Sequence, residues 1–392
     1  MPKVSIVLPT YNRADVLARA LASVARQSYT DWELIVVDDG STDSTEAVVK
    51  ESGVAVRYLR AQHGGVSAAR NLGIRESVSE YVAFLDSDDA WNPSYLSVCA
   101  GFLDDHPGEA LVATELLQDF GHGLTTLHPI AFVRGLYPKL ALRVGSHALD
   151  LPPGESDPYL RIFSKRIDVT DWLTRASGNR PSGQVFRYWG NIFPHFRWGY
   201  PFSVAASVLR RFAITEVGAF DESLSSGEDF SLLAEVCRRY PANFFAWPGY
   251  TKHEFGQEGL AQQEGHLATA GWKVVEFHIN LLRVFDALYD ARESADQELR
   301  RLRGYKLYTI GDHALKLGDH QLARQYFEES VQFFPEFMAA RGGLLVTKIM
   351  PAVGAKLYGP AGRVLATGGR IVRGRFSIRG FGRRLLQSKQ KG

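Results

Sequence analysis

The chain has 392 residues, of which 45% are hydrophobic and 22% are charged, and its formal net charge is +2. This length predicts two or three structural units, and the small net charge gives no global field that would attract nucleic acid. We expect a cytoplasmic protein, because Cys99 and Cys237 lie in apolar helical patterns and we find neither a signal peptide nor an apolar run of ~20 residues.

The first ninety residues alternate between expected strands and expected helices. Short apolar runs predict buried strands at residues 4–9, 32–37, 56–60 and 81–85. Amphipathic patterns and helix-start signals predict helices at residues 14–27, 41–52 and 65–77. This alternation is typical of an α/β fold with a mostly parallel sheet and helices on both faces. Ligands of such sheets bind beyond the carboxyl ends of the strands, so the acidic clusters 38–39 and 86–89 should share one cleft.

The rest of the chain is less regular. Residues 115–200 are rich in Gly, Pro, His and aromatic residues, and residues 201–241 predict a strand, a turn and a helix. From about residue 262 the pattern is helical. Residues 313–337 resemble one tetratricopeptide helix pair in the positions of Ala314, Leu315, Leu317, Gly318, Ala323, Phe327 and Pro335. An ordinary helical hairpin is the open alternative, because such repeats normally need about three copies.

We expect a first domain over residues 1–255, a helical region over 256–345 and a basic tail over 346–392. The segment 351–392 holds ten Lys or Arg and no Asp or Glu. Its cations are interleaved with apolar residues, which predicts peripheral contact with an anionic membrane surface. A solvated, disordered tail is the open alternative, and RNA binding is disfavoured because no aromatic stacking platform accompanies the charges.

The sequence AFLDSDDAWNP places three carboxylates, Asp86, Asp88 and Asp89, directly after a buried strand. Like charges this close raise one another's pKa unless a cation or a capped turn holds them. A hard divalent cation can bridge carboxylates to phosphate oxygens and keep several waters, so a metal site is one interpretation. The alternative is a capped turn before the next helix, with Asp89 or Asn92 as the cap.

Three further charged residues lie in positions suited to chemistry. Asp39 can accept the N–H of a nucleobase or a ribose hydroxyl, or it can cap the following helix. Arg70 lies in a helix entered through two glycines, where it can bind a phosphate or form a structural ion pair with Asp39 or Asp88. Asp229 begins an amphipathic helix after Gly227, where it can act as a general base or simply supply favourable charge to the helix start.

The chain resembles the family 2 glycosyltransferases over about residues 3–255, through four motifs: VSIVLPTYNRADVLARALASVARQSYTDWELIVVDDGSTDST, GGVSAARNLGI, AFLDSDDAWNP and GAFDESLSSGEDFSLLAEV. The resemblance implies a GT-A fold with a Rossmann-like sheet, and inverting transfer of a sugar from a nucleotide-sugar donor with Mn²⁺ or Mg²⁺. It implies a UDP-sugar as donor and a saccharide or lipid-linked acceptor. The setting it implies is bacterial surface polysaccharide or glycolipid synthesis at the cytoplasmic face of the inner membrane.

The resemblance also implies roles for individual residues. Asp229 would be the catalytic base, Asp88 a metal ligand, and Asp86 a neighbour of the ribose or the metal. His253 would approach the metal or the diphosphate, although residues 254–259 replace the continuation usual in the family. The nucleotide-binding residues that it implies are Pro9, Thr10, Tyr11 (stacked on the base), Asp38, Asp39, Arg70 and Asp86.

One departure from the family is the distance of 141 positions between Asp88 and Asp229. We therefore expect residues 115–200 to be a variable insertion on the acceptor side. Its aromatic residues would either stack on a sugar acceptor or form the core of an inserted subdomain. These residues are Trp172, Trp189, His195 and Trp198.

Two other function classes stay open. One is a catalytically inert, nucleotide-binding scaffold that recruits partners through its helical region. The presence of Asp39, Asp88 and Asp229 disfavours it, because a scaffold has no need of all three. The other is a glycoside hydrolase with paired carboxylates, which does not explain the glycine-entered helix with Arg70.

Overall fold

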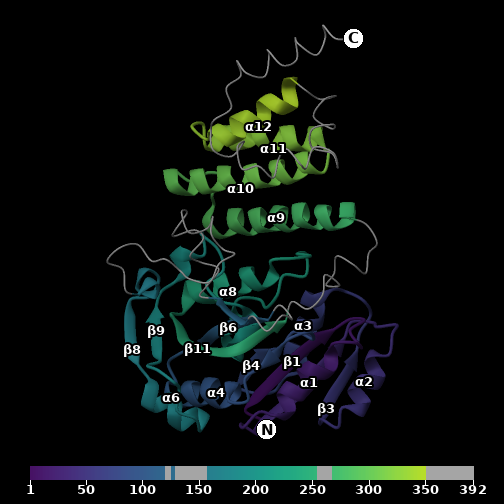
Figure 1. Ribbon diagram of the computed structural model, residues 1–392, viewed down its shortest axis with the longest axis vertical. Coiled ribbons are helices and arrows are strands. Elements are labelled where there is room, and N and C mark those ends of the chain that lie inside the picture. The colour runs from purple at the N-terminus through teal and green to yellow at the C-terminus, as the bar shows by residue number, and fades with distance from the viewer. Residues whose placement is uncertain (120–124, 129–156, 254–266, 350–392) are drawn as a thin grey trace. The chain divides into compact units, whose positions relative to one another are not determined.

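The computed structural model describes residues 1–119, 125–128, 157–253 and 267–349 (Figure 1). Contacts within the chain divide it into two units, Met1–Gly259 and Leu260–Gly392. Residues 254–259 and the tail 351–392 lie outside the described residues, so the expectations about them stay predictions. A search of the described helices finds none that is long and apolar enough to cross a bilayer.

The first unit is built around one mixed sheet, and we call its first four strands the parallel half. They are β1 (Val4–Thr10), β2 (Trp32–Asp38), β3 (Val56–Arg60) and β4 (Tyr81–Phe84), in the spatial order β3-β2-β1-β4. The connecting helices are α1 (Leu17–Ala25), α2 (Thr45–Glu51) and α3 (Val66–Glu76). Every neighbouring pair of these strands is parallel, which confirms the α/β class and the expected order of elements.

The parallel half is buried on both faces. One face packs against α1 and α4 (Tyr95–Asp105) through Ile6, Leu8, Leu34 and Val36. On the other face, Ile35 and Val37 pack against Ala69 of α3. Gly73 of α3 lies directly on Val7, where an added Cβ would come within 2.3 Å of the valine side chain. This close approach requires glycine and sets the height of α3 above β1.

We call the other large strands of the sheet the mixed half. They are β6 (Leu111–Asp119), β8 (Lys165–Asp168), β9 (Phe186–Gly190), β10 (Ser207–Arg210) and β11 (Ala242–His253). Strand β10 is antiparallel to both β4 and β6 and joins the two halves, and the order continues β6-β11-β9-β8. The two short strands β5 (Ala90–Trp91) and β7 (Thr125–His128) pair with β11 and β6. The helices of this part are α6 (Thr170–Ser177), α7 (Arg211–Glu216), α8 (Glu228–Arg239) and the short η1 (Pro158–Arg161), η2 (Phe193–His195) and η3 (Val204–Ala206).

Part of the expected insertion extends this sheet. Strands β8 and β9 form its edge, and β9 pairs with β11. The Trp172 indole packs against Phe245, and its Nε1 donates to Asp105 at 2.9 Å. The Trp189 Nε1 donates to Glu109 at 3.0 Å. These two tryptophans therefore have packing roles. Trp172 packs against the core of the first unit, and Trp189 bonds to Glu109 at the edge of the sheet.

The second unit consists of four described helices, α9 (Leu267–Tyr289), α10 (Gln297–Lys316), α11 (His320–Phe333) and α12 (Met338–Ile349). Ala314, Ala323 and Phe327 are buried in one cluster between α10 and α11. Gly318 makes the turn between these helices with a φ of +88°, and the Asp319 side chain caps α11 by accepting from the Leu322 N–H. The pair forms a helical hairpin, and a longer repeat array stays a prediction.

Candidate active site

The carboxyl ends of the parallel half carry the predicted acidic residues. Thr10 of β1 is in register with Asp38 of β2, and Val7 is in register with Phe84 of β4. The Asp39 N–H donates to the Thr10 carbonyl at 2.9 Å, so Asp39 leaves β2 beside the end of β1. The two acidic clusters therefore lie on either side of the end of β1, as the fold class predicted.

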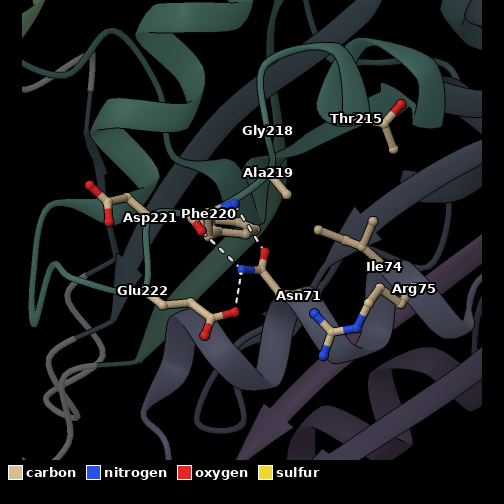
Figure 2. Close-up of a pocket in the computed structure, with 9 residues that line it drawn as sticks. All are labelled: Asn71, Ile74, Arg75, Thr215, Gly218, Ala219, Phe220, Asp221 and Glu222. Atoms are coloured by element: carbon tan, nitrogen blue, oxygen red, sulfur yellow. Dashed lines mark hydrogen bonds between the residues drawn. The ribbon is translucent and has the colours of Figure 1, made fainter.

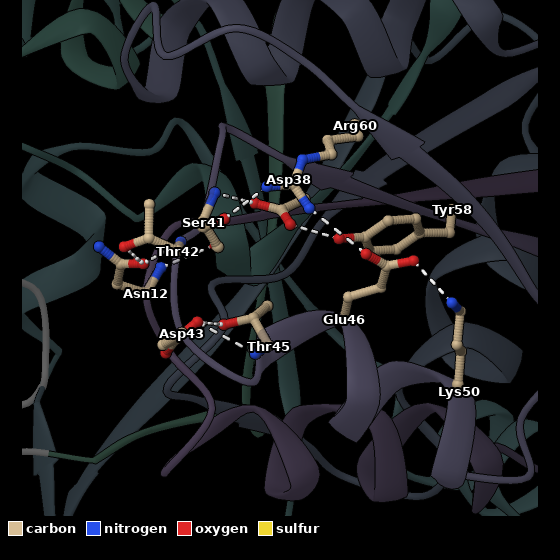
Figure 3. A network of polar contacts seen from close by, with 10 residues as sticks. All are labelled: Asn12, Asp38, Ser41, Thr42, Asp43, Thr45, Glu46, Lys50, Tyr58 and Arg60. Atoms are coloured by element: carbon tan, nitrogen blue, oxygen red, sulfur yellow. Dashed lines mark hydrogen bonds and ion pairs between the residues drawn. The ribbon is translucent and has the colours of Figure 1, made fainter.

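Asp38 is fully buried in the polar network of Figure 3. Its carboxylate accepts from the Ser41 N–H at 2.7 Å and from the Tyr58 hydroxyl. Burial, and then the Asp38 charge, raise the pKa of Tyr58, so this hydroxyl stays a donor. The Ser41 hydroxyl in turn accepts from the Asn12 N–H at 2.8 Å. Asp38 thus shapes the loops after β1 and β2, and its contact with a nucleotide stays a prediction.

Asp39 anchors the loop that enters α3. Its two carboxylate oxygens accept from the N–H groups of Gly64 and Gly65, at 2.8 and 2.9 Å. The His63 Nδ1 lies 2.8 Å from the same carboxylate, and the His63 ring stacks on Tyr11 with 4.2 Å between centroids. Tyr11 is 41% exposed and the His63 side chain 59%, so the pair presents an accessible aromatic surface beside Asp39. The sequence analysis missed His63, whose signal is its place directly before the two glycines.

Arg70 joins the two parts of the site. Its side chain is 6% exposed; Nη2 donates to Asp86 at 2.9 Å and Nη1 donates to Glu228 at 2.7 Å. The structural ion pair is therefore present, but its predicted partners, Asp39 and Asp88, were wrong. The guanidinium also lies 5.2 Å from the centre of the Phe220 ring. Asp86 follows β4 and Glu228 begins α8, so one cation holds the acidic cluster and the start of α8 together.

The three carboxylates after β4 have different surroundings. Asp89 accepts from the Tyr250 hydroxyl and from the His253 N–H at 2.8 Å, which ties this loop to β11. Burial, followed by the charges of Asp86 and Asp88, raises the pKa of Asp89 to about 7. Within the described part of the chain, the Asp88 carboxylate has no hydrogen bond or ion pair to another residue. Burial, and then Asp86, raise its pKa.

The capped-turn interpretation holds only for Asn92. Its side chain accepts from the Ser94 N–H at 3.0 Å, just before α4. Asp89 is not a cap, because it bonds to β11 instead. Among the residues that the structure describes, the Asp88 carboxylate has no partner and lies beside a like charge, which is an arrangement that a bound cation would relieve.

Asp86 and Asp88 fit a hard divalent cation, although the described residues contain no cluster of three or more His, Cys, Asp or Glu placed to hold a metal. Two carboxylates are enough for Mg²⁺-type binding, because such ions keep several waters and take phosphate oxygens as further ligands. The His253 Nδ1 lies 3.2 Å from an Asp119 oxygen, and burial lowers the pKa of His253. A metal role for His253 stays a prediction.

Asp229 lies in the first turn of α8, next to Glu228. Its Oδ1 accepts from the Phe230 N–H at 2.8 Å and from the Tyr200 hydroxyl at 3.0 Å. Burial, and then the Glu228 charge, raise the pKa of Asp229 to about 6, while Arg70 opposes the rise. A carboxylate with such a pKa is ionised at neutral pH and still basic enough to accept a proton. The sequence offered no signal for Tyr200, which lies 29 positions before Asp229.

Two further predicted residues end β1. Pro9 is buried, and its neighbour Thr10 is 4% exposed. The Thr10 hydroxyl has no hydrogen-bond partner among the described residues. Contact of either residue with a nucleotide stays a prediction.

The hollow in Figure 2 lies beside this site and is distinct from it. Its lining includes neither Asp88 nor Asp229. Within it, the Asn71 side chain donates to the Phe220 carbonyl at 2.9 Å and accepts from the Phe220 N–H at 3.0 Å. These two hydrogen bonds from Asn71 of α3 fix the loop that carries Phe220, whose ring lies against Arg70.

Comparison with known proteins finds a family model that matches part of this chain. Residues 5–146 match the model of glycosyl transferase family 2. This part of the chain is similar to glycosyltransferase family 2. An uncharacterized glycosyltransferase of Rickettsia felis is 35% identical over 106 residues, which is 26% of this chain and 18% of the relative. The poly(ribitol-phosphate) beta-N-acetylglucosaminyltransferase TarS of Staphylococcus aureus is 36% identical over 118 residues, covering 29% of this chain and 21% of TarS.

These matched segments span about a fifth of each relative, at 18% and 21% of their lengths. A solved structure of TarS residues 1–349 in complex with UDP-GlcNAc shares the fold more widely. Its TM-score is 0.51 at 16% sequence identity, covering 93% of this chain and 92% of that one. The likeness confirms the predicted GT-A fold class with a helical C-terminal region.

Proposed function

We propose that this glycosyltransferase is an inverting, metal-dependent enzyme that moves a sugar from a UDP-sugar to a saccharide or lipid-linked acceptor. We further propose that it acts in surface polysaccharide or glycolipid synthesis. The observation that carries the proposal is the bridge from Asp86 through Arg70 to Glu228. It brings the carboxylates suited to a metal and a diphosphate beside Asp229, the residue suited to deprotonate an acceptor.

In this proposal, the nucleotide of the donor binds at the end of β1. Tyr11 and His63 offer an aromatic surface on which a base can stack, and the Asp39 carboxylate beside His63 can accept a base N–H. Both Asp39 oxygens already accept backbone N–H groups, which holds the carboxylate still in the position where a base would meet it. The solved TarS complex contains UDP-GlcNAc, which favours a uridine nucleotide.

Asp88 and Asp86 would hold a divalent cation, Mn²⁺ or Mg²⁺, against the diphosphate. When bound, the cation neutralises charge on the departing diphosphate, which contributes several kcal/mol to such reactions. Arg70 keeps one Asp86 oxygen engaged and orients that carboxylate. The free carboxylate of Asp88 is available as a ligand.

Asp229 then takes the proton from the acceptor hydroxyl. As this proton leaves, the hydroxyl oxygen bonds to the anomeric carbon, and the bond from that carbon to the diphosphate oxygen breaks. The electron pair leaves on the diphosphate. A single direct displacement inverts the anomeric configuration and needs only one base. Arg70 and Glu228 fix the start of α8, so the base approaches from the side of the mixed half.

Calorimetric titration tests the donor site. UDP, GDP and dTDP are titrated into the full chain with and without Mn²⁺, and into Asp88→Ala. We expect UDP to bind most tightly, to need Mn²⁺, and to weaken ~100-fold or more without Asp88, since a metal–phosphate bridge is worth several kcal/mol. Asp171→Ala, an exposed acid on α6, is the matched control and should bind as the wild type. Absence of binding by all three nucleotides would overturn the proposal and favour the scaffold.

A further inference from the structure

We propose that Tyr200 positions the Asp229 carboxylate so that only one of its two oxygens, Oδ2, receives the acceptor's proton. The inference rests on the proposed function, in which Asp229 is the base. It concerns the part of the chain between β9 and β10, where the sequence indicated no role for Tyr200.

The geometry distinguishes the two oxygens. The Tyr200 hydroxyl and the Phe230 N–H both donate to Oδ1, at 3.0 and 2.8 Å. Among the described residues, Oδ2 of Asp229 accepts no hydrogen bond. Hydrogen bonds to a carboxylate oxygen stabilise its charged form and lower its affinity for a proton. The proton from the acceptor therefore goes to Oδ2, which keeps its lone pairs free.

The Tyr200 ring is held in place by the helix that carries the base. The Tyr200 ring packs edge-on against Phe230 of α8 with 4.9 Å between centroids. Phe196 packs against the Phe230 ring as well, with 5.5 Å between centroids. Burial, followed by the Asp229 charge, raises the pKa of Tyr200. The hydroxyl therefore stays protonated and can only donate to the carboxylate. Tyr200 is a positioning residue, because it touches the base and does not need to touch the substrate.

Five influences set the protonation of Asp229, and one of them, the Phe230 N–H on the same helix, favours the carboxylate. Burial and Glu228, on the same helix, favour the neutral acid, whereas Arg70 of α3 and Tyr200 favour the carboxylate. Removal of the Tyr200 hydroxyl takes away one influence that favours the carboxylate and leaves the others, including Arg70, in place. The ionised base would then persist only at higher pH. Oδ1 would keep one donor, the Phe230 N–H, instead of two, so the two oxygens would differ less.

The test uses Tyr200→Phe in the full chain, with release of UDP from UDP-GlcNAc in Mn²⁺ measured from pH 5 to 9. We expect the acidic limb of kcat/KM to move up by about one unit, because a hydrogen bond to a charged group is worth about 1.5 kcal/mol or more. Turnover at pH 6 then falls ~5-fold and turnover at pH 8.5 changes little. A loss by the same factor at every pH, or an unmoved limb, would overturn the inference.

Tyr240→Phe is the matched control. The Tyr240 hydroxyl also donates to a carboxylate, that of Glu216, but at the far end of α8 and in exposed surroundings. This variant should leave the acidic limb where it is in the wild type. A wild type that neither binds nor turns over the nucleotide sugar would sink the proposed function itself. Normal wild-type turnover with an unmoved limb in Tyr200→Phe would sink only the role of Tyr200.

A second measurement is independent of turnover. Thermal unfolding at pH 8 is followed for the wild type, Tyr200→Phe, Asp229→Asn and the double variant. We expect Tyr200→Phe to lower the Tm less in the Asn background than in the Asp background, because the hydroxyl then has no ionised partner. At pH 5, where Asp229 is mostly protonated, this coupling should shrink. Equal losses in both backgrounds at both pH values would show that the hydroxyl does not hold the carboxylate.

Discussion

The parallel half and the mixed half of the sheet reach the same site by different routes. In the parallel half, each strand leads through a helix to the next strand in sequence, and Asp39 and Asp86 follow β2 and β4, the two strands that flank β1. In the mixed half, strand neighbours are distant in sequence, and Arg70 meets Glu228 across 158 positions. In the proposed function, the first half holds the nucleotide and the second half supplies the base. A variant in the parallel half should therefore affect mainly nucleotide binding, and a variant in the mixed half mainly turnover. A variant at their junction should affect both.

The largest effect is expected in the mixed half. Asp229→Asn removes the proton acceptor but keeps the shape and most contacts of the side chain. We expect turnover of the donor to fall ~10²–10⁴-fold, as for loss of a general base, while UDP affinity stays within about twofold. Initial rates and calorimetry on the same preparation check this. A simultaneous loss of UDP affinity would show that nucleotide binding and proton transfer are not separated between the two halves.

The junction itself is tested by Arg70→Ala. This variant leaves the nearly buried Glu228 without its cation, so the free energy of unfolding should fall by about 3–5 kcal/mol. Urea unfolding measures it. Arg57→Ala removes an exposed ion pair between β3 and Glu76 of α3 and should cost less than about 1 kcal/mol. Equal losses in the two variants would mean that Arg70 does not join the halves.

The pH dependence separates the halves in another way. The Asp229 pKa is raised to about 6 from an ordinary value of 3.8, and the proposed base acts in its ionised form. Turnover should therefore be lost as the pH falls through about 6, at close to tenfold per unit, and recover fully above it. The acidic limb of kcat/KM at fixed Mn²⁺ reports this. A limb near pH 4 would contradict the surroundings described for Asp229.

A smaller effect is expected in the parallel half. Tyr11→Ala removes one ring of the exposed pair with His63 and should weaken UDP about tenfold, which corresponds to about 1.4 kcal/mol of stacking. Turnover at saturating donor should stay near that of the wild type. Calorimetry measures the affinity, and Tyr305→Ala, an exposed tyrosine of α10, is the control. An unchanged UDP affinity would remove Tyr11 from the nucleotide site.

The smallest expected effect concerns the tail, which lies in neither half. Truncation after residue 350 removes ten cations and should reduce sedimentation with anionic phosphatidylserine vesicles while donor turnover in solution is unchanged. Neutral phosphatidylcholine vesicles are the control. Equal sedimentation of the full and truncated chains with anionic vesicles would contradict peripheral membrane contact.

The sequence predicted the two halves unequally for a physical reason. Buried parallel strands have apolar runs and their helices have local start signals, so β1 to β4 and the acids at their ends could be read directly. The pairing of Arg70 with Asp86 and Glu228 could not, because it depends on how α8 packs against α3. Tyr200 was missed for the same reason. Trp172 and Trp189 were recognised as aromatic but not placed, since stacking and core positions have the same local pattern.

The central claim is that both halves build one active site, and a crystal structure with UDP and Mn²⁺ tests it most directly. The account predicts uracil against Tyr11, the metal between Asp88 and the diphosphate, and Asp229 facing the open side of the bound nucleotide with Oδ2 free. A nucleotide bound elsewhere, or a metal site that excludes both Asp86 and Asp88, would contradict it.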